Sequence, residues 1–160
     1  RAVMFLDPYG MDVEWRTLEA IARTKAIDLW YLFSLSGLYR QATRDVSNID
    51  PSKRAALDRM LGNNRWQSEL YSMASEQTLF GETSLERRSS DVRGLEAYVK
   101  ERLKEIFPTV LSPLALPRTR RPQLFSLFFA ISNPDPRAIG PATRIASHIL
   151  SSGSSSQVRP

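Results

Sequence analysis

The sequence opens with an apolar run at residues 3–6, and Asp7-Pro8-Tyr9-Gly10 stops this run with turn-forming residues. An uninterrupted apolar run of this kind is typical of a strand buried on both faces, as in parallel sheets covered by helices. Asp12 is placed to cap the amphipathic helix that follows, and a second apolar run lies at residues 27–33. The start of the chain therefore predicts a strand–helix–strand unit and an α/β fold.

The predicted opening strand also bears on the size of the sheet. A strand in a parallel sheet has neighbours on both sides, whereas this sequence begins within the strand and without an initiator methionine. We therefore expect further strands to come from polypeptide outside the sequence, so that residues 1–150 form the C-terminal part of a larger α/β domain.

Composition limits the class of protein. The chain has 160 residues, of which 42% are hydrophobic and 24% charged, as in an ordinary soluble globular domain. No apolar run approaches the roughly 18–20 residues of a membrane-spanning helix, and no signal peptide is visible. The absence of cysteine excludes disulfides and thiolate metal sites, and it fits a cytoplasmic protein. The net charge of +5 agrees equally with a phosphate-bearing partner such as nucleic acid and with a merely basic soluble protein.

The middle of the chain, about residues 36–107, predicts a helical insertion. Its most regular helix lies at residues 91–107, where apolar residues recur at spacings of three and four. Another helix begins at Asp50-Pro51, a capping carboxylate followed by proline, and ends at Gly62. Two further elements complete the insertion, a short helix at residues 65–73 and a polar connection at residues 77–90.

The last third of the chain predicts two strands and a helix. The apolar runs at residues 110–116 and 124–131 are too close in sequence for a parallel crossover, so they must be antiparallel if they pair. A closing helix is expected at residues 136–150, and the Ser/Gly-rich residues 151–160 are expected to form a disordered tail.

The turn after the first strand has two interpretations. Asp7, Pro8 and Gly10 stand at the positions that a plain type I turn prefers. Alternatively, an acidic residue at the carboxyl end of a strand, with proline fixing the next carbonyl, aims two hydrogen-bond acceptors at one point. Such acceptors can hold an exocyclic amine, and Tyr9 can stack on a planar base, an interaction of ~1–3 kcal/mol in single-strand binders.

These four residues after an apolar strand resemble the fourth motif of Rossmann-fold, S-adenosylmethionine-dependent amino-methyltransferases, in which Asp/Asn-Pro-Pro-aromatic holds the target nitrogen. They are more similar still to the Asp-Pro-Phe-Gly of tRNA guanine dimethyltransferases. Most of residues 3–150 resembles the bacterial family of three-Cys-motif partner proteins. The segments that carry this resemblance are residues 5–15, 24–33, 62–66 and 127–134, and its specific part lies in residues 1–35.

The resemblance implies the C-terminal half of a Rossmann-like, class I methyltransferase-type three-layer domain, with a mainly parallel sheet that ends in an antiparallel β-hairpin. It also implies methyl transfer from S-adenosylmethionine to an amino group of a nucleobase or nucleic acid, with Asp7, Pro8 and Tyr9 as catalytic residues. Tyr9 and Gly10 would bind the substrate, and a three-Cys-motif protein would be a partner. The alternative is a non-catalytic binding partner on a methyltransferase-like scaffold.

Two departures from the family pattern bear on these expectations. Ser34 stands where the pattern has proline, and the glycine-rich loop that holds the cofactor is absent. In such folds this loop belongs to the half of the sheet upstream of Asp7. We therefore expect the cofactor-binding residues upstream of residue 1, and we expect this chain alone to bind S-adenosylmethionine poorly and to be inactive.

Arg118, Arg120 and Arg121 form the densest basic cluster of the chain, between the two late strands. They form either a solvated turn or a substrate-binding site that contacts a phosphate beside the substrate cleft.

The remaining polar and aromatic candidates favour structural roles. Asp28 lies within an apolar run and is expected to be a buried, hydrogen-bonded carboxylate. Trp15 and Trp30 are expected in the core, and His148 on the solvent side of the last helix. With one histidine and no cysteine, the sequence has no metal-ligand spacing.

Overall fold

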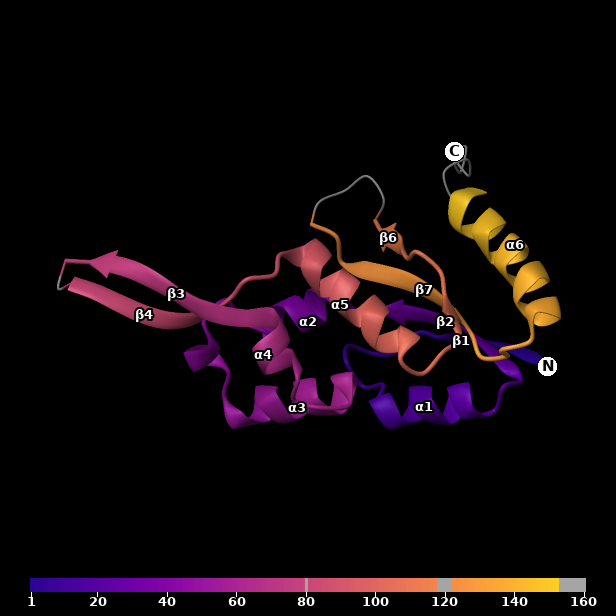
Figure 1. Cartoon of the computed structure of the whole chain (residues 1–160), viewed down its shortest axis with the longest axis horizontal. Helices are drawn as coiled ribbons and strands as arrows, with labels where there is room; N and C mark the ends of the chain where they lie inside the picture. Colours follow the sequence, from indigo (N-terminus) through magenta and orange to yellow (C-terminus); the bar gives the residue numbers. More distant parts are fainter. Residues whose placement is uncertain (80, 118–121, 153–160) are drawn as a thin grey trace.

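A computed structural model describes residues 1–79, 81–117 and 122–152. A five-stranded sheet with helices packed around it forms the body, and a long β-hairpin projects from one end (Figure 1). The predicted α/β class is confirmed. Within the described residues, no helix has the length and the apolar character needed to cross a membrane.

The sheet has the strand order β1-β2-β7-β5, with β6 also paired to β7. β1 runs parallel to β2, as the predicted strand–helix–strand unit requires, and β7 runs antiparallel to β2, β5 and β6. Four strands therefore point one way and β7 points the other, which confirms the antiparallel ending. The strands are β1 (Ala2–Leu6), β2 (Ile27–Phe33), β5 (Thr109–Val110), β6 (Leu114–Leu116) and β7 (Phe125–Ile131).

Helices cover the two faces of the sheet unequally. Leu29, Tyr31 and Phe128 face a large core shared with the helices of one side, whereas Phe129 and Ile131 face a small core built with α6. Figure 1 shows α6 apart from the other helices. The helices are α1 (Trp15–Arg23), α2 (Leu35–Gln41), the 3-10 turn η1 (Val46–Asn48), α3 (Pro51–Leu61), α4 (Trp66–Leu70), α5 (Val92–Lys104) and α6 (Pro136–Ser152).

The ends of the predicted helices follow local chemistry. Asp50 caps α3 by accepting a hydrogen bond from the Lys53 backbone N–H at 2.9 Å, and this bond lowers the pKa of Asp50. Gly62 ends α3 with a φ of 79°, in the left-handed region that favours glycine. Asp91 caps α5 in the same way, at 2.8 Å from the Gly94 N–H. For α1 the prediction is wrong, because the residue at its N-cap is Glu14 rather than Asp12.

The insertion contains an unpredicted hairpin. β3 (Tyr71–Thr78) and β4 (Gly81–Arg88) pair antiparallel over their whole length, where the sequence predicts the end of a helix and a polar connection. Its strands lack the strong alternation of apolar and polar residues that marks a half-buried strand. The hairpin instead depends on contacts with a distant part of the chain.

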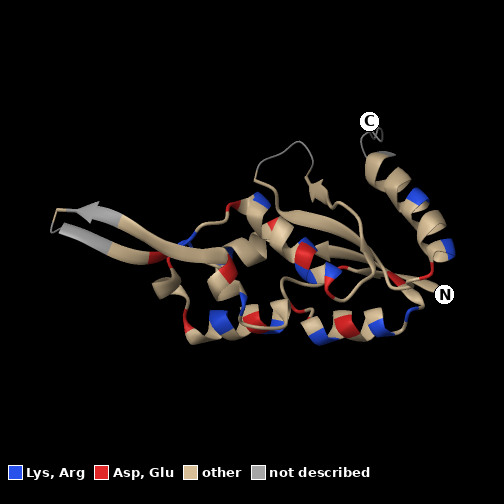
Figure 2. Ribbon diagram, viewed as in Figure 1, with Lys and Arg blue, Asp and Glu red and all other residues tan. Residues whose placement is uncertain are grey.

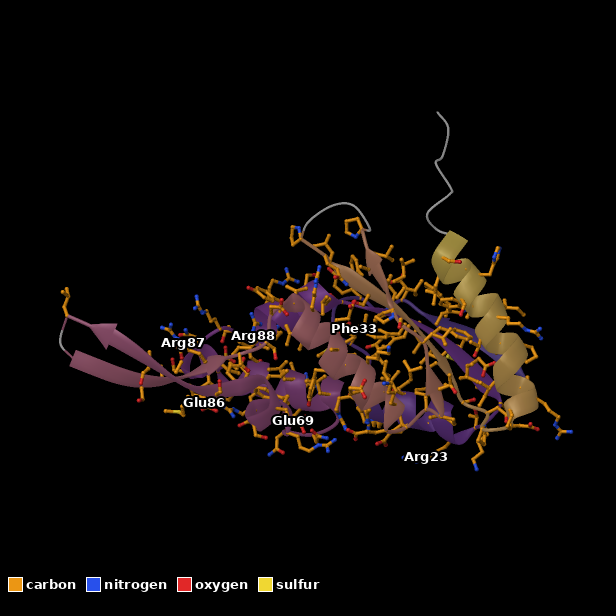
Figure 3. The ribbon with its side chains drawn as sticks, turned by 45° about the horizontal axis from the view of Figure 1, so that its top comes forward. Arg23, Phe33, Glu69, Glu86, Arg87 and Arg88 are labelled. Atoms are coloured by element: carbon orange, nitrogen blue, oxygen red, sulfur yellow. The ribbon has the colours of Figure 1, made fainter. Side chains whose placement is uncertain are left out.

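Those contacts lie at the base of the hairpin (Figure 3). The Arg88 guanidinium stacks on the Tyr39 ring at 4.1 Å and donates hydrogen bonds to the carbonyls of Tyr39 and Ala42 at the end of α2. The Tyr71 hydroxyl donates to the Thr43 carbonyl at 2.7 Å. The end of α2 therefore holds both strands of the hairpin where they leave the body.

The position of β1 is a correction to the predicted burial on both faces. β1 is the outermost strand of the sheet in the described part of the chain, and Val3 and Phe5 are 66% and 57% exposed. Met4 and Leu6, on the opposite face, pack against the large core. The apolar run correctly predicts a strand, but whether a neighbour covers its second face does not follow from the run itself.

The last helix also departs from expectation in detail. α6 continues through Ser151 and Ser152, two residues that the sequence assigned to the tail, and residues 153–160 lie outside the described residues. Ala146 is buried in the small core, whereas Ile149 is 47% exposed.

Candidate functional site

The turn Asp7-Pro8-Tyr9-Gly10 follows directly on β1, at the edge where β1 and β2 both end. β7 starts at the same edge, because Phe33 at the end of β2 pairs with Ser126. The Ser36 N–H donates to the Leu124 carbonyl at 2.9 Å, which ties the segment after β2 to the start of β7. The structure therefore brings the turn to the edge at which the parallel strands β1 and β2 have their carboxyl ends, where ligands bind in open α/β folds.

The four residues of the turn are open to solvent to different degrees. Tyr9 is 93% exposed, Asp7 and Gly10 are exposed and Pro8 is half-buried. Gly10 has a φ of 65°, so a glycine is favoured at the end of the turn. Among the residues that the structure describes, the Asp7 carboxylate has no hydrogen-bond or ion-pair partner. Its oxygens are therefore available as acceptors.

The cavities that the structure shows among the described residues do not include the turn in their linings. Two cavities of about 460 and 440 Å³ are lined by residues of other segments, such as Glu14 and Asp58 in one and Ile106 and Pro108 in the other. In this part of the chain, no strand pairs with the outer side of β1.

Ser34 and Gly37 shape the edge next to the turn. The Ser34 hydroxyl accepts a hydrogen bond from the Gly37 N–H at 3.3 Å and begins α2. A Cβ on Gly37 would lie 3.1 Å from Cγ of Met11, so glycine lets Met11 pack against the start of α2. This contact joins the segments that follow β1 and β2.

The basic cluster Arg118, Arg120 and Arg121 lies outside the described residues. The strand ends that flank it, Leu116 and Phe125, pair with each other at the carboxyl edge. Elsewhere, acidic and basic residues alternate along α1, α3 and α5 (Figure 2). These helices therefore present mixed charge to a ligand.

The polar and aromatic residues expected to have structural roles lie where the sequence predicts them. Asp28 is 6% exposed and accepts hydrogen bonds from Arg1 at 3.1 Å and from the Ser132 N–H at 3.4 Å. Trp15 is buried in the large core, and the half-buried Trp30 packs on Phe129 with ring centroids 4.5 Å apart. His148 is exposed on α6. In the described ranges, no three His, Asp or Glu side chains gather into a possible metal site.

Comparison of the chain with protein-family models, with curated proteins and with solved structures finds no match. The functional argument therefore depends on the turn, its place in the sheet and the resemblance of its residues to a known motif.

Proposed function

We propose that this chain carries the substrate-facing part of an S-adenosylmethionine-dependent methyltransferase that acts on an amino group of a nucleobase or nucleic acid. The observation that supports the proposal is the place of Asp7-Pro8-Tyr9-Gly10 at the end of β1, beside the end of β2. A sheet in which only β7 is reversed also agrees with the C-terminal half of a Rossmann-like domain.

The chemistry assigned to the turn is the orientation of an amine. The Asp7 carboxylate and the Pro8 carbonyl accept hydrogen bonds from the two N–H groups of an exocyclic amine, which directs the nitrogen lone pair away from both acceptors. The exposed ring of Tyr9 offers a stacking surface for the base, worth ~1–3 kcal/mol in comparable sites. A target base in a duplex has to be flipped out to reach such a turn.

The described residues do not themselves fit S-adenosylmethionine. Gly10 is the only glycine in the segment between β1 and α1, so this segment is not a glycine-rich loop. Within the described residues, no strand pairs with the outer side of β1.

The proposal is tested by incubating the protein, purified at its native length, with radiolabelled S-adenosylmethionine and single-stranded nucleic acid. We expect label in the nucleic acid with the wild-type protein and little with Asp7→Ala. Equal incorporation by both proteins would remove Asp7 from the mechanism.

A second function is favoured by the open surroundings of the turn. Tyr9 at 93% exposure is suited to contact a protein surface without any chemistry, as in a non-catalytic partner of a three-Cys-motif protein. Calorimetric titration of S-adenosylmethionine into the native-length protein separates the two functions, because only the methyltransferase requires cofactor affinity.

A further inference from the structure

Two exposed arginines at the end of α2 have no partner among the described residues. Arg40 lies in the last turn of α2, and Arg44 follows three residues after the helix ends. Neither side chain forms a hydrogen bond or an ion pair with the part of the chain that the structure describes. By contrast, the exposed Arg23 and Arg137 each pair with a carboxylate at 2.9 Å. The charges of Arg40 and Arg44 are therefore available to a ligand.

These two arginines lie beside two more at the base of the hairpin, where Figure 3 labels Arg87 and Arg88. The Arg88 N–H donates to the Arg44 carbonyl at 2.8 Å, which places residues 39–45 and 86–88 side by side. Together these segments contain four arginines and two acidic residues. The base of the hairpin therefore carries an excess of positive charge.

Tyr39 adds an exposed aromatic ring beside these charges. The Arg88 guanidinium lies over the ring, 4.1 Å from its centroid, and its hydrogen bonds to the Tyr39 and Ala42 carbonyls hold it there. Tyr39 is nevertheless 45% exposed, so part of the ring is open to a second planar group. An exposed aromatic ring next to positive charge is the combination with which proteins bind single-stranded nucleic acid.

We propose that this arginine–tyrosine patch, made of Tyr39, Arg40, Arg44 and Arg88, binds single-stranded nucleic acid. Arg40 and Arg44 contact two backbone phosphates, and a base stacks on the exposed part of the Tyr39 ring. An acidic protein would satisfy the two arginines but would make no use of the ring. A duplex would supply phosphates, but its bases are already stacked on one another. A single strand alone uses all parts of the patch.

The patch is separate from the turn at Asp7. Gly37, in the first turn of α2, lies next to Met11 of the segment that follows β1, whereas the patch lies at the other end of this helix. The seven residues of α2 span about 10 Å at the helical rise of about 1.5 Å per residue. The proposal therefore goes beyond the proposed function, because this second contact holds whether or not Asp7 orients an amine.

Fluorescence anisotropy tests the proposal with the protein at native length and without S-adenosylmethionine. The probes are labelled single-stranded DNA and RNA of about 16 nucleotides, and the dissociation constant is measured over a series of salt concentrations. We expect Arg40→Gln/Arg44→Gln to raise the dissociation constant. We also expect the slope of its logarithm against the logarithm of the salt concentration to fall by about 1.4, which is about 0.7 for each lost phosphate contact.

A second double variant is the matched control. Arg23→Gln/Arg137→Gln removes the same charge from two arginines that already have partners, and it is expected to leave the salt slope unchanged. Equal slopes in the two double variants would overturn the proposal, as would the absence of binding to both DNA and RNA.

Substitutions of Tyr39 test the stacking. Tyr39→Leu is expected to weaken binding about 5- to 150-fold, the equivalent of ~1–3 kcal/mol, and to leave the salt slope unchanged. Tyr39→Phe keeps the ring and is expected to bind as the wild type does. Equal affinities of Tyr39→Leu and Tyr39→Phe would show that no base stacks on the ring and would overturn the proposal.

Two competitors test the class of ligand. Polyglutamate or a duplex that displaces the labelled strand as well as an unlabelled single strand does would assign the patch to an acidic protein or to a duplex and would overturn the proposal. Asp7→Ala is expected to keep the salt slope of the wild type, because Asp7 contacts no phosphate. A failure of methyl transfer and a failure of this proposal therefore appear in different assays.

Discussion

Arg102 is predicted to stabilise the helical side of the sheet more than any surface charge does. The side chain is 4% exposed on α5, donates to the Leu61 carbonyl through Nε at 3.3 Å and Nη2 at 2.8 Å, and pairs with Glu105. Its guanidinium also lies 4.6 Å from the Trp15 ring of α1. One side chain thus joins three helices, because Leu61 is the last residue of α3.

The substitution Arg102→Met keeps the apolar stem and removes all of these contacts. A hydrogen bond to a charged group contributes about 1.5–3 kcal/mol, and a cation–π contact about 0.5–2 kcal/mol. We therefore expect the free energy of unfolding in urea to fall by about 2–5 kcal/mol. Arg93→Met, an exposed position on the same helix, is the matched control and is expected to change it by less than about 0.5 kcal/mol. A change in Arg102→Met as small as in the control would refute the reasoning.

Two further predictions concern Gly62 and Tyr71. A left-handed backbone costs a residue other than glycine ~1–2 kcal/mol. Gly62→Ala is expected to destabilise the protein by more than this, because the new Cβ would also lie 2.3 Å from the Trp15 ring. A melting temperature equal to that of the wild type would contradict this prediction. Burial raises the pKa of Tyr71 from its ordinary value of 10.0 to about 12. The contribution of the neutral Tyr71 side chain to the free energy of unfolding is therefore complete below pH 10 and is lost as the pH rises through 12. Tyr71→Phe is expected to cost about 1 kcal/mol at pH 8 through the lost bond to Thr43 and to show a smaller further loss between pH 10 and 12, measured by urea unfolding. An alkaline loss equal to that of the wild type would show that Tyr71 does not contribute to it.

The elements that the sequence predicted are those whose ends depend on neighbouring residues. Asp50-Pro51 and Gly62 define α3 within one short segment, and Asp91 with a regular apolar stripe defines α5. The antiparallel pairing of the late strands followed from a connection too short for a crossover. In each case the deciding chemistry lies within a few residues of the element.

The elements that the sequence missed depend on distant contacts. β4 is held through Arg88, whose partners Tyr39 and Ala42 lie more than 40 residues earlier, and nothing local in residues 77–90 indicates a strand. The sequence also did not predict the buried position of Arg102. An arginine on a helix is usually solvated, and the burial of this one depends on contacts with α1 and α3.

The predictions for the candidate site show the same difference between local and distant determinants. The position of the turn at the end of β1 was predicted correctly, because an apolar run and four turn-forming residues define it locally. The exposure of one face of β1 was not predicted, because it depends on what lies against the outer side of the strand. The three arginines at 118, 120 and 121 lie outside the described residues and stay a prediction.

The claim on which the account depends most is that Asp7 orients an amine for methyl transfer. Its most direct test is the single-turnover rate constant of the native-length protein with saturating S-adenosylmethionine, measured for Asp7→Ala and for the control Asp12→Ala, another exposed aspartate just after the turn. We expect Asp7→Ala to lower the rate constant by about 100-fold or more, with the cofactor dissociation constant unchanged, and Asp12→Ala to leave both unchanged. Equal rate constants in the two variants would contradict the claim.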